Sequence, residues 1–166
     1  MGLASCGGGG GKSSSQVPVN LDVLDDYFTV KSCKLETNVA EKGIEHLGDA
    51  KGMLTLVLKR NKEEMKIKPS DIEWAELEGT SEASNYKVFG ADIDAVARKL
   101  VKLEPGTVET VEIPLKIFDP HKSYNSDEDN QRLRQAHYDA LIGVNGALSQ
   151  ISMFVELKGH DDDDDY

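Results

Sequence analysis

The sequence predicts a mainly β domain, an antiparallel β-sandwich with one or two inserted helices; an α+β arrangement is the alternative. Three observations indicate this class. Apolar and polar residues alternate in several short segments, as they do in half-buried strands. Two other segments carry the helical period instead. Strand and helix patterns do not alternate regularly along the chain, as a parallel, doubly wound sheet would require, so antiparallel pairing is favoured.

Two segments are the clearest strands. Segment 53–60 places Leu54, Leu56 and Leu58 on one face. Segment 103–118 has a turn at Pro105-Gly106, and the strand after it alternates strictly through Val111, Ile113, Leu115 and Ile117. Pro114 lies on the opposite face of this strand and cannot donate a ladder hydrogen bond, which predicts an edge strand or a bulge.

Two further strands carry local signals. Segment 27–37 changes phase between Val30 and Cys33, which predicts a β-bulge near Ser32. Cys33 is then expected to be a small buried apolar side chain. Segment 71–77 places Ile72 and Trp74 on one face, and a last strand alternates through Ile151, Met153, Val155 and Leu157.

Helical spacing marks two segments. Apolar residues recur at that spacing in 91–103, where a helix capped by Asp92 is favoured and a strand stays open. Segment 126–142 predicts a second helix, with Ser126 and Asp129 forming a capping box and Gly143 ending it. Its predicted apolar stripe is Leu133, Ala136, His137, Ala140 and Leu141, so His137 is expected to be a partly buried structural side chain.

Charge and length narrow the classes of function. The 166 residues hold 30 acidic and 19 basic side chains, a net charge of -11. Nucleic acids and anionic lipid head groups attract basic surfaces, so neither is an expected partner. We expect a flexible segment at 1–19, one β-rich domain over 20–159 and an acidic tail at 160–166. No apolar run in the sequence is long enough to span a bilayer.

The amino-terminal tetrapeptide Leu3-Ala4-Ser5-Cys6 resembles the lipobox of bacterial lipoproteins. In that family, the cysteine is lipid-modified after a signal peptidase cuts before it. The resemblance therefore implies a lipid on Cys6 and an anchor in the bacterial cell envelope, at the outer membrane or in the periplasm. Such signals begin with a basic and an apolar region. Only Met1 and Gly2 precede the motif, so we expect the front of the export signal to be missing from this sequence.

The residues after Cys6 fit an anchor. Five glycines at 7–11 and three serines at 13–15 have the composition of a flexible tether. Farther along, the stretch from Leu103 to Ile113 is similar to the turn and strand found late in immunoglobulin-like domains of bacterial lipoproteins. That likeness implies an immunoglobulin-like form of the predicted sandwich.

Trp74 is the candidate centre of a ligand site. It is the only tryptophan of the chain, and acidic residues, including Glu73 and Glu76, surround it in the sequence. An aromatic ring can stack on a sugar while carboxylates accept hydrogen bonds from its hydroxyls. The favoured alternative is that Trp74 anchors the hydrophobic core.

No segment carries a catalytic, phosphate-binding or metal-binding motif. Two cysteines cannot make a disulfide framework or a four-ligand zinc site. The acidic run 126–130 is explained by a helix start, and the aspartates at 161–165 by a solvated tail. We therefore expect no cofactor and a non-catalytic, lipid-anchored envelope domain that binds a protein or glycan partner. A small periplasmic hydrolase or enzyme inhibitor and a structural spacer are the alternatives.

Overall fold

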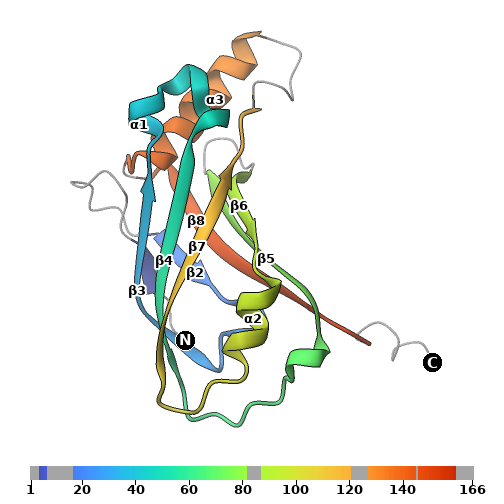
Figure 1. The fold of residues 1–166 in the computed structure, drawn as a ribbon. Coiled ribbons are helices and arrows are strands. Elements are labelled where there is room, and N and C mark those ends of the chain that lie inside the picture. Colours follow the sequence, from blue (N-terminus) through green and yellow to red (C-terminus); the bar gives the residue numbers. More distant parts are fainter. Residues whose placement is uncertain (1–3, 7–16, 82–86, 121–126, 145, 160–166) are drawn as a thin grey trace.

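A computed structural model describes residues 4–6, 17–81, 87–120, 127–144 and 146–159 of the chain. Strands β2 to β8 form one mixed sheet that is nearly closed into a barrel, and the three-residue strand β1 extends it (Figure 1). The strands are β1 (Ala4–Cys6), β2 (Val17–Asn20), β3 (Phe28–Thr37), β4 (Lys51–Arg60), β5 (Ile72–Ser81), β6 (Lys87–Asp92), β7 (Val108–Ile117) and β8 (Leu148–Leu157).

The strands follow the order β1-β2-β8-β5-β6-β7-β4-β3. Every described pairing is antiparallel except that of β2 with β8, which is parallel. The outermost strands, β1 and β3, contact one another, so the sheet curls until its two edges meet. The predicted mainly β class is confirmed. The immunoglobulin-like sandwich is not confirmed, because one continuous sheet surrounds the core in place of two stacked sheets.

The register feature predicted for β3 is present, whereas that predicted for β7 is not. The pairing of β3 with β4 shifts between Val30 and Ser32, which confirms the bulge near Ser32. The shift places Cys33 on the same inner face as Phe28. On β7, the described pairing with β6 is limited to two residues near Ile117, so the strand is open on that side next to Pro114. β7 is nevertheless not an edge strand, since it lies between β6 and β4, and its register with β4 does not shift at Pro114. The proline is accommodated because the described β6 ladder stops short of it.

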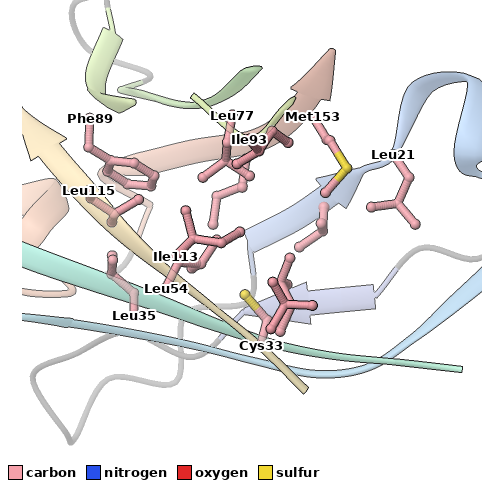
Figure 2. Close-up of a cluster of buried hydrophobic side chains, with 14 of the residues drawn as sticks. Leu21, Cys33, Leu35, Leu54, Leu77, Phe89, Ile93, Ile113, Leu115 and Met153 are labelled. Carbon is pink, nitrogen blue, oxygen red and sulfur yellow. The ribbon is translucent and has the colours of Figure 1, made fainter. Parts of the chain in front are cut away.

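Side chains from all around the sheet fill the barrel. Figure 2 shows Leu35, Leu54, Leu77, Phe89 and Ile113 converging from different strands on one cluster. Each of these five side chains is at most 2% exposed. A barrel of this size is narrow enough for its inward-facing side chains to fill the interior.

Helix α2 (Asp94–Leu100) confirms the helical interpretation of segment 91–103, while β6 takes up the start of that segment. The predicted cap is wrong by one residue: the N-cap is Ile93, which has no side-chain capping bond. Asp92 precedes it, and its side chain accepts a hydrogen bond from the Asp94 backbone N–H at 3.0 Å. Ala97 and Leu100 are buried, and α2 contacts β5. The helix therefore closes over the strand that carries Trp74.

Helix α3 (Asp127–Leu141) is the second predicted helix, and its predicted cap Ser126 lies outside the described residues. It lies at the end of the barrel where the short helices α1 (Val39–Lys42) and η2 (Ile44–Asp49) also lie (Figure 1). His137 is 2% exposed, as expected. Arg134, which the sequence does not mark as buried, is 7% exposed and donates to Glu45 of η2 at 2.7 Å. Two further short helices are η1 (Asp22–Leu24) and η3 (Pro69–Asp71).

Burial of His137 makes stability depend on pH. Burial lowers the pKa of His137 below 6.5, although a hydrogen bond to the Phe118 carbonyl and the charge of Asp119 act in the opposite direction. The unfolded chain therefore binds a proton at this site at a higher pH than the folded chain does. We expect the free energy of unfolding to fall as pH drops below about 6.5, by at most about 1.4 kcal/mol per pH unit from this residue.

Urea unfolding at pH 7.5 and pH 5.5 measures this effect. The comparison is with His137→Gln, which removes the titrating group. The free energy of unfolding should fall more between pH 7.5 and pH 5.5 for the wild-type chain than for the variant. Equal differences in both proteins would contradict the assignment to His137.

Candidate functional site

Trp74 lies on the outer face of the barrel. Its side chain is 41% exposed, so the expectation that it anchors the core is wrong. Ile72, predicted to share its face, is fully buried at 0% exposure. The two residues therefore point to opposite sides of β5.

A bulge in β5 explains the reversal. In the pairing with β8, Ile72 lies opposite Leu157 and Trp74 lies opposite Glu156, so Glu73 is an extra residue in the ladder. One extra residue moves every later side chain to the other face. Alternation read from the sequence alone cannot reveal this change, because it depends on the partner strand.

A hollow of about 270 Å³ lies beside the Trp74 ring. It is lined by Trp74, Ala75, Glu76, Asp92 and Asp94. Glu76 and Asp92 are direct cross-strand neighbours on β5 and β6. The hollow therefore joins one aromatic ring to three carboxylates drawn from two strands and the start of α2.

Backbone hydrogen bonds fix two of these carboxylates. Asp94 Oδ1 accepts the Ala75 N–H at 2.6 Å, and Asp92 Oδ1 accepts the Asp94 N–H at 3.0 Å. The bond between Asp94 and Ala75 also ties α2 to β5, next to Trp74. These carboxylates are thus held in place before any ligand arrives, which lowers the entropy lost on binding.

The structure brings together two of the three predicted residues. Trp74 and Glu76 line the hollow, whereas Glu73 does not. The Glu73 and Ile72 backbone carbonyls accept hydrogen bonds from the Arg98 guanidinium at 3.3 and 2.9 Å. Glu73 therefore lies at the bulge and beside the site.

A second aromatic ring was not anticipated. Phe154 on β8 is 41% exposed and lies directly opposite Glu76 in the ladder. It is a diagonal neighbour of Trp74, a relation that places two large side chains within reach of one another. We call the outward-facing residues Trp74, Glu76, Asp92, Asp94 and Phe154 the Trp74 surface. In the sequence, only the alternation of 151–157 indicates that Phe154 is exposed, because it places Phe154 on the other face of the strand from the buried residues.

The Trp74 surface is acidic. Lys87 Nζ lies 3.7 Å from Glu76 and 3.4 Å from Glu78, and it balances only part of the charge. Glu156, opposite Trp74, adds another carboxylate to this side of β8. Among the residues that the structure describes, no group of three or more His, Cys, Asp or Glu side chains could hold a metal ion. The arrangement is suited to stacking against a ring and accepting hydrogen bonds from donors around it.

The two cysteines lie in neighbouring parts of the fold. The backbone of Cys6 belongs to β1, which pairs with β2 and contacts β3, and its side chain lies outside the described part. Cys33 on β3 is 8% exposed, so its predicted burial is confirmed. It is also disulfide-bonded, a state that the alternation pattern around it does not indicate. Cys6 is the one other cysteine in the sequence.

No described helix is long and apolar enough to cross a membrane. Comparisons with protein-family models, with curated proteins and with solved structures found no significant match. The amino-terminal motif and the geometry of the Trp74 surface are therefore the features that point to a function.

Proposed function

We propose that this chain is a lipid-anchored protein of the bacterial cell envelope whose non-catalytic β domain binds a glycan through the Trp74 surface. The single observation that carries the binding proposal is the outward orientation of Trp74 beside fixed carboxylates. A large aromatic side chain that is 41% exposed gives up much of the stabilisation that burial would provide. Two such rings on adjacent strands form an apolar patch of the kind that marks interaction surfaces.

The chemistry of the patch favours a sugar with uncharged or cationic groups. The face of the Trp74 ring can lie against the C–H face of a pyranose. Glu76, Asp92 and Asp94 offer only hydrogen-bond acceptors when ionised, and sugar hydroxyls are donors. An anionic glycan would meet like charge at the same place, at an energetic cost. The proposed ligand is therefore a neutral or amino-sugar-containing glycan.

The anchor proposal rests on the lipobox-like tetrapeptide and the tether composition after it. It makes a specific claim about Cys6, because a sulfur atom that carries a lipid cannot also form a disulfide. Cys33 is disulfide-bonded, and Cys6 is the other cysteine of the chain. A lipid on Cys6 and a disulfide between Cys6 and Cys33 are therefore mutually exclusive outcomes.

Detergent-phase partition tests the anchor. We expect the full gene, expressed with its complete export signal in a Gram-negative host, to yield protein in the detergent phase. Cys6→Ala should move that protein to the aqueous phase. Cys33→Ser is the matched control and should stay in the detergent phase. Wild-type protein in the aqueous phase, with mass spectrometry showing Cys33 linked to Cys6, would contradict the anchor.

Calorimetric titration against a panel of neutral, amino-sugar and acidic glycans tests the binding surface. For a glycan that binds, we expect Trp74→Ala to weaken the affinity at least tenfold, because a central aromatic anchor contributes on the order of 2 kcal/mol or more. Val108→Ala is the matched control, since Val108 is 55% exposed on β7, outside the Trp74 surface. It should bind normally. No binding across the panel would favour the structural spacer instead.

A further inference from the structure

A second cavity, separate from the Trp74 surface, lies where the ends of β3, β4 and β7 meet η2. Its volume is about 600 Å³, within the range typical of small-molecule sites. The outward-facing residues Met53 and Pro114 are direct neighbours across β4 and β7 and form part of its wall. Leu115 and Ile117 add further apolar atoms.

Two glycines open this cavity. Gly48 of η2 and Gly52 of β4 both line it and contribute no side chain. A Cβ atom at Gly52 would lie 3.3 Å from Thr37 Cγ2 and 3.4 Å from Leu115 Cδ1, so a larger residue would crowd this wall. The cavity therefore depends on the absence of side chains at Gly48 and Gly52, and a larger residue at either position would narrow it.

Two lysines are paired across the sheet at one end of this cavity. Lys51 and Lys116 both line the cavity and lie directly opposite each other in the β4–β7 ladder. Like charges in this relation destabilise a sheet. Neither has an ion-pair partner among the described residues; Lys116 Nζ instead lies 5.8 Å from the centre of the Phe118 ring.

Acidic groups near the cavity are engaged elsewhere. Glu36 lines it, and its carboxylate lies 3.3 Å from Lys34 Nζ. Asp119 lies behind Gly48, and its charge acts on His137. A bound anion would therefore find the Lys51 and Lys116 pair as its nearest unengaged charges.

We propose that this cavity binds a small amphipathic carboxylate, such as a medium-chain fatty acid. The carboxylate lies between Lys51 and Lys116 and relieves their repulsion through charge-assisted hydrogen bonds. The acyl chain lies against the outward-facing Met53 and Pro114. This site is independent of the Trp74 surface and does not rest on the proposed glycan.

Titration calorimetry with decanoate, decanol and acetate tests the proposal. Decanoate should bind more tightly than either comparison molecule, since only decanoate has both the charge and the chain. Lys51→Gln/Lys116→Gln should weaken decanoate binding about tenfold or more. Lys59→Gln, on the outer face at the other end of β4, is the matched control and should bind normally, as should Trp74→Ala.

Three results would overturn the proposal. In the first, the wild-type protein does not bind decanoate measurably. In the second, decanol binds as tightly as decanoate. In the third, the double variant and Lys59→Gln lose the same amount of decanoate affinity. A thermal unfolding curve for each variant establishes that it is folded before it is titrated. An unfolded double variant would be replaced by the single changes Lys51→Gln and Lys116→Gln, for which the same order of affinities is expected.

Discussion

Gly79→Ala should destabilise the domain by about 3 kcal/mol or more, at the upper end of the range for overpacked cores. Gly79 of β5 lies opposite Phe89 of β6. A Cβ atom at position 79 would lie 2.2, 2.4 and 2.7 Å from three carbon atoms of the Phe89 ring. The ring is 0% exposed and belongs to the buried cluster drawn in Figure 2, so moving it would displace other core side chains.

Urea unfolding measures this loss, and two further variants make the result specific. Gly48→Ala is the matched control, because its nearest neighbours would lie at an ordinary 3.6 Å; we expect a change within about 0.5 kcal/mol. Adding Phe89→Leu to Gly79→Ala should recover part of the lost stability, since a smaller side chain leaves room for the methyl group. A Gly79→Ala protein as stable as the Gly48→Ala protein would contradict the packing described for Phe89.

Arg60→Ala should cost about 3 kcal/mol, the second-largest effect expected. Arg60 ends β4 and is 3% exposed. Its guanidinium donates to the backbone carbonyls of Asn61 and, at 2.8 Å, Glu63, and it lies 5.8 Å from the centre of the Tyr27 ring. Its backbone N–H donates to the Thr107 carbonyl at 2.8 Å. One residue thus holds two turns at this end of the barrel.

Alanine at position 60 would leave the two carbonyls without their donor and remove the cation from the tyrosine face. Lys59→Ala, one residue earlier and exposed, is the control and should change the free energy of unfolding by less than about 0.5 kcal/mol. Chemical unfolding of the three proteins provides the comparison. An Arg60→Ala protein that matches the Lys59→Ala protein would show that the buried guanidinium contributes nothing to these turns.

Many of the strands and helices could be predicted, because the spacing of apolar residues within one segment determines its secondary structure and its buried face. The alternation through Ile113 and Leu115 follows from which side of the sheet is buried. The bulge near Ser32 is visible because apolar residues on both sides of it change phase. The α3 helix follows from its apolar spacing. Each of these signals lies within one segment of the chain.

The closure of the sheet could not be predicted in the same way. It depends on β2 pairing in parallel with β8 and on β1 meeting β3, and these strands are far apart in sequence. Alternating apolar residues are equally compatible with a sandwich and with a barrel, since both bury one face of every strand.

The candidate site likewise combines features that one segment determines with features that depend on strand pairing. Trp74 and Glu76 could be proposed because an aromatic residue and acids stand close together in one segment. The orientation of Trp74 could not, because the extra residue in β5 is defined by its partner β8. Asp92 was expected only as a helix cap. Its position opposite Glu76 depends on the β5–β6 hairpin.

The central claim is that Trp74 faces the solvent and meets a ligand there. Because Trp74 is the only tryptophan, acrylamide quenching of tryptophan emission in the native protein tests the claim directly. We predict a red-shifted emission that acrylamide quenches readily and that a bound glycan protects. A blue-shifted emission that acrylamide hardly affects in the native protein, and readily quenches only after unfolding, would place Trp74 in the core and contradict the account.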